Sequence, residues 1–191
     1  ALQRHMHAPR AIDLRRLNRV ILWTQRNPHG LEYHQLPEPR VLLAIGDSAF
    51  QAPTDAEMAE GRDPLVMRGY VWALASHDGS KYNLQVLEYV SSRQHHVCRG
   101  VWSAELHNQC DMIEMASIIS GFTLETIHGP QSGESLKNAL ATGNLPMKIE
   151  ALTDSYSIFS YLAAAHLKLP AERSTYYHLA YLREQLVSRH I

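Results

Sequence analysis

The sequence predicts an α/β fold: a mixed sheet of three antiparallel strands and one parallel strand, flanked by helices and preceded by an N-terminal helix. Three apolar segments follow one another with turn residues between them, which favours an antiparallel meander. A long segment with helical spacing comes next. One further short strand and two helices follow it, and this order is typical of an α/β domain.

Composition limits the classes of protein to consider. The 191 residues, 45% hydrophobic and 19% charged, suit one domain with a buried core. The formal net charge of −1 provides no overall basic field, so any nucleic-acid contact must be local or shared with another domain. Cys98 and Cys110 are too few for a disulfide framework, which favours an intracellular location, cytoplasmic or nuclear. No apolar run reaches the roughly 18 residues of a membrane span, so we expect no membrane partner.

Residues 1–36 are expected to be a connecting segment with a basic amphipathic helix. Arg and Leu recur at helical spacing over residues 8–24, and Asn27-Pro28-His29-Gly30 would end the helix. Residues 31–36 are compatible with a short strand or a linker. The segment has no initiator Met and no signal-peptide core at its start, so we expect it to continue a longer chain. The main domain then covers residues 37–191.

Four short apolar segments of the main domain are expected to be strands: 40–45, 68–77, 84–90 and 147–152. The first lies between Pro39 and Gly46 and is expected to present Asp47 at its end. Residues 51–63 are polar and would form a loop, and His77-Asp78-Gly79-Ser80 is typical of a hairpin turn.

Helical spacing predicts a long helix over residues 103–127, because Leu106, Cys110 and Ile113 fall on one face. Residues 134–141 are compatible with one short helix. Two later helices are expected at 155–165, with Ser155 as N-cap, and at 172–189, with Leu179, Leu182 and Leu186 facing inward.

Three carboxylates occupy comparable places in this pattern. Asp47 follows the first strand, Glu105 lies near the start of the long helix, and Asp154 follows the fourth strand. Adjacent strands of an α/β sheet present their carboxyl ends to one crevice. Three acids gathered there repel one another unless a cation such as Mg²⁺ joins them. Each acid alone also has a plainer explanation, as a turn residue, a helix cap or a partner of the helix dipole.

Short motifs occur around these acids in a fixed order: Gly46-Asp47-Ser48-Ala49-Phe50, Arg68-Gly69-Tyr70-Val71, Val101-Trp102-Ser103-Ala104-Glu105-Leu106, Thr153-Asp154-Ser155 and Tyr177-His178-Leu179-Ala180-Tyr181-Leu182-Arg183-Glu184. Together they resemble the first strand, second strand, glutamate helix, fourth strand and late helix of the ribonuclease H domain of copia-type LTR retrotransposon polyproteins. Residues 8–33 resemble the segment that joins such a domain to its reverse transcriptase. The resemblance spans nearly the whole chain.

The resemblance implies a ribonuclease H-like fold and two-metal hydrolysis of the RNA strand of an RNA–DNA hybrid. Asp47, Glu105 and Asp154 would inherit the catalytic and metal-ligand roles, with Mg²⁺ or Mn²⁺ as the cofactor. The implied partners are the RNA–DNA hybrid and the reverse-transcriptase domain of the same polyprotein.

Two departures from the family leave other interpretations open. A fourth acid of the family follows one further strand, in an Ala-Asp-x-Leu-Thr-Lys motif, so we expect this domain to lack the last strand and helix. Arg173-Ser174-Thr175-Tyr176 stands where many relatives carry Lys-His-Ile-Asp. One alternative is therefore a decayed or co-opted, non-catalytic module that binds protein or nucleic acid. Another is a generic Mg²⁺-dependent phosphodiesterase with the same site and a different substrate.

A local basic patch precedes the glutamate helix. Arg93, His96 and Arg99, together with Arg68, are candidate contacts to a nucleic-acid backbone, although a solvated turn explains them equally well. The chain has 12 histidines, but none is paired at a helical metal-binding spacing, so we expect surface or polar-cluster roles and no zinc. His178 would either approach the acids or lie exposed on its helix.

Overall fold

The computed structural model describes residues 11–28, 30, 32–59, 65–77, 79–145 and 147–187. The chain divides into two compact units, Ala1–Tyr33 and His34–Ile191. None of the described helices is long and apolar enough to cross a bilayer.

The first unit contains helix α1 (Ala11–Arg26), which corresponds to the basic amphipathic helix predicted from the sequence. The predicted first residues of this helix, 8–10, lie outside the described part of the chain. Leu14, Leu17 and Ile21 are exposed on it. Residues 32–36 form no strand, which favours the linker interpretation of that segment as far as it is described.

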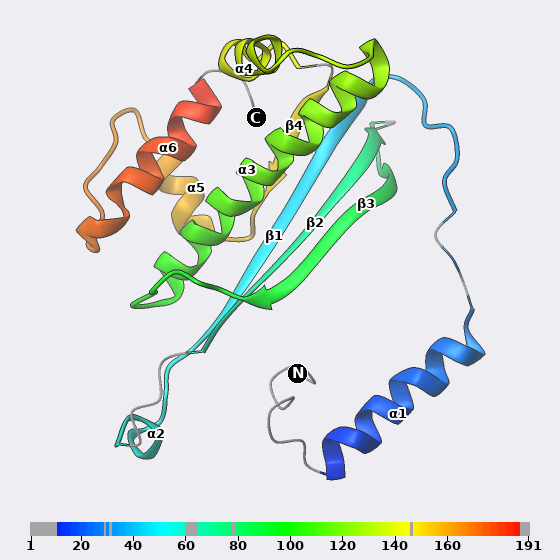
Figure 1. Ribbon diagram of the computed structural model, residues 1–191. Coiled ribbons are helices and arrows are strands. Elements are labelled where there is room, and N and C mark those ends of the chain that lie inside the picture. Colours follow the sequence, from blue (N-terminus) through cyan, green and yellow to red (C-terminus); the bar gives the residue numbers. More distant parts are fainter. Residues whose placement is uncertain are drawn as a thin grey trace. The chain divides into compact units, whose positions relative to one another are not determined.

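The second unit is built on the predicted mixed sheet, with strands β1 (Arg40–Gln51), β2 (Leu65–His77), β3 (Tyr82–Arg93) and β4 (Lys148–Leu152). The order across the sheet is β3-β2-β1-β4 (Figure 1). β1 pairs with β2 and β2 with β3 in the antiparallel sense, while β4 runs parallel to β1. The fold class predicted from the sequence, with its ribonuclease H-like arrangement of strands, is therefore confirmed.

Strand β1 is longer than predicted, and Asp47 lies inside it, so the expectation that the strand ends at this residue is wrong. β1 pairs with β2 without a break as far as Gln51, opposite Leu65. Continuous pairing with a neighbouring strand satisfies the backbone groups of Gly46 and Asp47, and this outweighs their local preference for turns. The predicted loop beyond β1 contains a short helix, α2 (Asp55–Ala59).

The helices of the second unit are α3 (Val101–His128), α4 (Gly133–Thr142), α5 (Tyr156–Ala163) and α6 (Tyr176–Val187). α3 packs on the sheet, and α5 and α6 pack beside it (Figure 1). α5 ends two residues before the prediction. The predicted last helix begins instead as a 3₁₀ turn, Arg173–Thr175, before α6.

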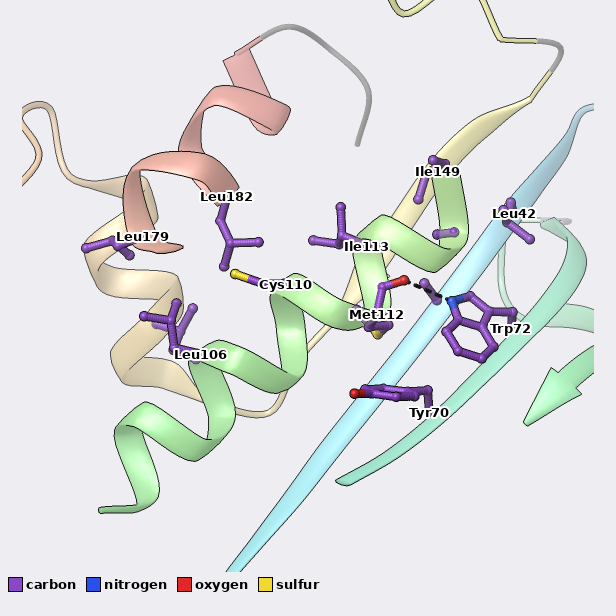
Figure 2. Close-up of a cluster of buried hydrophobic side chains, with 13 residues drawn as sticks. Leu42, Tyr70, Trp72, Leu106, Cys110, Met112, Ile113, Ile149, Leu179 and Leu182 are labelled. Carbon is purple, nitrogen blue, oxygen red and sulfur yellow. Dashed lines mark hydrogen bonds between the residues drawn. The ribbon is translucent and has the colours of Figure 1, made fainter. Parts of the chain in front are cut away.

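The core lies between α3, the sheet and α6 (Figure 2). The indole Nε1 of Trp72 donates a hydrogen bond to the carbonyl oxygen of Met112, 3.1 Å away, which satisfies the polar atom of a fully buried ring. Leu179 and Leu182 of α6 are buried as predicted. Leu186 is 40% exposed, against the prediction, and it lines an open apolar cavity of about 260 Å³ together with residues of α3, α5 and the end of β4.

Candidate metal centre

The sheet places two of the predicted acids at one edge. β1 and β4 run in parallel, and their last registered pair is Ile45 with Leu152. Asp47 and Asp154 each lie two residues beyond that pair. Because β4 ends at Leu152, it does not pair with β1 as far as Asp47. The residues that follow β4 place Asp154 beside this unpaired edge of β1.

Helix α3 delivers the third acid, and a close approach to β1 fixes its position. A Cβ atom on Gly46 would lie 2.8 Å from Sδ of Met112 and 3.1 Å from Nδ2 of Asn108, so a larger residue at position 46 would displace these two side chains of α3. Nε2 of Gln109 donates a hydrogen bond to the carbonyl oxygen of Gly46, 3.3 Å away. Gln109 lies one helical turn after Glu105, so this contact holds the acid beside β1.

The three acids converge. One carboxylate oxygen from each of Asp47, Glu105 and Asp154 lies within 4.8 Å of the other two. Asp47 and Asp154 are exposed, whereas Glu105 is only 7% exposed. The structure thus brings together the three side chains that the sequence singled out, although one of them comes from the interior of a strand.

The environment of Glu105 favours a bound cation. Burial raises the pKa of its carboxyl group, and the charges of Asp47 and Asp154 raise it further, while Ser48 partly opposes the shift. Oε2 of Glu105 is buried and has no hydrogen-bond partner among the described residues. A divalent cation would satisfy that oxygen and neutralise the repulsion. Three carboxylates are the hard oxygen donors that Mg²⁺ or Mn²⁺ prefers, so the residues fit such an ion.

The four predicted nucleic-acid contacts divide into two pairs. Arg68 donates a hydrogen bond to the carboxylate of Asp111 on α3, and Nε2 of His96 lies 3.5 Å from the other oxygen of the same group. Arg93 and Arg99 are exposed. Contact of these residues with a nucleic acid stays a prediction.

A shallow groove of about 410 Å³ lies beside Asp47 of the three acids. Its lining includes Asp47, Arg68, Gly69 and Tyr89. Tyr89 is 71% exposed on the outer strand β3, and Gly69 leaves the floor open opposite Asp47. The groove gives an extended ligand access to the exposed carboxylate of Asp47.

Some functional features were missed from the sequence. His178 takes neither of the two expected positions, because its ring packs against the rings of His107 and His96. The role of Gln109 was also missed, although a spacing of four residues places it on the same face of the helix as Glu105. Comparisons with protein-family models, with curated proteins and with solved structures gave no match to this chain.

Proposed function

We propose that this chain is a metal-dependent nuclease domain that hydrolyses the RNA strand of an RNA–DNA hybrid. The observation that carries the proposal is the convergence of Asp47, Glu105 and Asp154 at the end of β4. The order of strands in the sheet and the motifs around the three acids support it. In this proposal the domain works in the cytoplasm or nucleus, beside the reverse-transcriptase domain of the same polyprotein.

Each part of the site has a role in this proposal. Asp47, Glu105 and Asp154 hold Mg²⁺ or Mn²⁺, and the ions, when bound, supply an activated water and stabilise the leaving oxygen. Gln109 keeps Glu105 beside β1 through its bond to Gly46. The groove next to Asp47 admits the nucleic-acid backbone.

One observation favours a second candidate, a non-catalytic module. Arg68 and His96 already interact with Asp111 inside the domain, so neither is a free cation awaiting a phosphate. If Arg93 and Arg99 alone contact nucleic acid, binding will be weak and sensitive to salt, because few phosphates are neutralised. The interactions of Arg68 and His96 with Asp111 therefore favour one form of this candidate, a decayed or co-opted domain that binds protein.

Cleavage of a labelled RNA–DNA hybrid by the full chain, with Mg²⁺ and with EDTA, tests the proposal. We expect cleavage that requires Mg²⁺ and leaves the DNA strand intact. Equal cleavage of double-stranded DNA would instead indicate a generic phosphodiesterase. If no nucleic acid is cleaved and Mg²⁺ does not raise the melting temperature, the proposed nuclease is wrong and the non-catalytic candidate replaces it.

A further inference from the structure

A second group of metal-binding side chains lies on the other side of α3 from Glu105. It combines two residues of the loop between β3 and α3, one residue of α3 and one residue of α6. We propose that this group is a zinc site with three imidazole ligands and one thiolate ligand: His96, Cys98, His107 and His178. The proposal does not depend on the nuclease function.

One pair of the proposed ligand atoms already lies at the distance of two ligands around one ion, whereas in the described part of the chain no three of the four lie within 4.8 Å of one another. Sγ of Cys98 lies 3.6 Å from Nδ1 of His107. A sulfur 2.3 Å and a nitrogen about 2.05 Å from one tetrahedral Zn²⁺ are separated by about the same distance. The ring centroid of His107 lies 4.7 Å from that of His96 and 4.4 Å from that of His178, and the centroids of His96 and His178 are 6.2 Å apart. Imidazoles that share a tetrahedral zinc have centroids about 5 Å apart.

Burial explains why three of these side chains, Cys98, His107 and His178, need a polar partner. Cys98 is 4% exposed and His107 is 7% exposed. Nδ1 of His178 is buried and finds no hydrogen-bond partner in the described part of the chain. A buried polar atom without a partner costs free energy, and a coordinated metal ion would remove that cost.

Zinc binds the deprotonated form of a cysteine or histidine side chain. Burial raises the pKa of the Cys98 thiol. Binding of Zn²⁺ therefore forms an S–Zn bond as the S–H bond breaks, and the proton leaves to the solvent.

The surrounding charges orient the ligands. The Asp111 carboxylate lies 3.5 Å from Nε2 of His96 and also accepts hydrogen bonds from Arg68 and from the hydroxyl of Tyr70. A carboxylate bound to one ring nitrogen directs the other nitrogen toward a metal, as around many metal sites. Glu172 is the further charged group that acts on Cys98 and His107. His96 and His178 must still turn about their side-chain torsions to complete the four-ligand arrangement.

Titration of the full chain with Co²⁺, after removal of metals with EDTA and desalting, tests the site. We expect one equivalent of Co²⁺ to give the absorption of a tetrahedral cobalt thiolate, and Zn²⁺ to abolish it by displacement. Zn²⁺ should also raise the melting temperature, because it joins the β3–α3 loop, α3 and α6. Co²⁺ that is held only by surface histidines gives no thiolate band. If the wild-type chain shows no such band, the proposal is overturned.

Four variants locate the ligands. Cys98→Ser and His178→Ala should each lose the thiolate band and the rise in melting temperature with Zn²⁺. His95→Ala removes an exposed histidine next to His96, and Asp154→Asn changes the acidic centre. Both variants should keep the thiolate band and the rise in melting temperature with Zn²⁺. Melting curves and far-ultraviolet circular dichroism of the metal-free variants show whether each one folds. A folded His178→Ala that binds Co²⁺ with the wild-type band and affinity would contradict the four-ligand site.

Discussion

The first turns of α3 carry two contrasting groups of ionisable side chains. Glu105 belongs to the acidic centre and His107 to the histidine cluster. Side chains two positions apart in an α-helix are separated by about 200° around its axis, so these two point to opposite sides of α3. Burial disfavours the charged form of both, so it raises the pKa of Glu105 and lowers that of His107. In each group the neighbouring side chains of the same kind shift the pKa further in the same direction.

The two groups differ in their access to solvent. Asp47 and Asp154 are exposed, which leaves room for water and substrate oxygens on a bound ion, as magnesium requires. Cys98 and His107 are almost fully buried, which is typical of structural zinc sites without an open position. One helix thus contributes to an open group of oxygen donors and to a group of nitrogen and sulfur donors in which Cys98 and His107 are buried and the His96 side chain is 46% exposed.

The largest expected effect is the loss of nuclease activity when the acidic centre is changed. Asp154→Asn keeps the size of the side chain and removes the charge that would hold the proposed metal ion. We expect the rate of hybrid cleavage in Mg²⁺ to fall by about three or more powers of ten, which corresponds to at least about 4 kcal/mol of transition-state stabilisation. Single-turnover cleavage kinetics measure this loss. Cleavage at the wild-type rate would refute the role of Asp154 at the acidic centre.

The next effect tests the close approach of α3 to β1. Gly46→Ala places a Cβ atom 2.8 Å from Sδ of Met112 and 3.1 Å from Nδ2 of Asn108, so these α3 side chains must leave the positions that they hold against β1. We expect a loss of about 2–3 kcal/mol in the free energy of unfolding and weaker binding of Mn²⁺. Urea unfolding and Mn²⁺ titration measure the two effects.

Gly69→Ala on β2 is the matched control. Its Cβ would meet only backbone oxygens, at 3.7 and 3.8 Å, and these are ordinary contacts. We expect little change in the free energy of unfolding or in Mn²⁺ binding. If both alanine variants behave alike, the close approach at Gly46 does not set the geometry of the acids.

The acidic centre was easier to predict from the sequence than the histidine cluster, for a physical reason. Asp47 belongs to β1, Asp154 follows the neighbouring parallel strand β4 by two residues, and Glu105 belongs to the helix between those strands in sequence, so local patterns and sheet topology were enough. The extension of β1 beyond Gly46 could not be predicted, because it depends on hydrogen bonds to β2 rather than on local preference.

The histidine cluster depends on contacts that are remote in the sequence. His178 meets His107 only because α6 packs against α3, and that packing is set by buried leucines such as Leu179 and Leu182. Nothing in the spacing of the histidines indicates it. The exposure of Leu186 escaped prediction for a related reason, since helical spacing shows which face is apolar but not how far the partner helix extends.

The pH dependence of stability distinguishes the two groups in the metal-free protein. His107 has a pKa of about 4 in the folded state and near 6.5 when unfolded, so the unfolded chain binds more protons between these values. Stability should therefore fall as the pH drops from about 6.5 toward 4. Each pKa unit is worth about 1.4 kcal/mol, and partial screening of the ring by solvent reduces the total to about 1–2 kcal/mol.

Glu105 has the opposite sign. Its raised pKa means that the folded chain holds the proton more tightly, so its contribution is lost as the pH rises above the ordinary value of 4.5. Urea unfolding with EDTA separates the contributions of His107 and Glu105 to the free energy of unfolding. It is measured across this pH range for the wild type, His107→Gln and Glu105→Gln. An unchanged acid limb in His107→Gln would show that another group causes it.

The smallest expected effect concerns repulsion within the acidic centre. Asp47→Asn removes one of three negative charges that lie close together, and without a divalent ion this should raise the free energy of unfolding by about 0.5 kcal/mol, because Asp47 is exposed and screened. Added NaCl should diminish the difference. In Mg²⁺ the order should reverse, because the wild-type chain binds the ion more tightly and gains more stability from it. Thermal unfolding of both proteins, with EDTA and with Mg²⁺, measures the reversal. If Asp47→Asn is the less stable protein under both conditions, Asp47 contributes to the fold itself, and repulsion among the acids is not what a bound cation relieves.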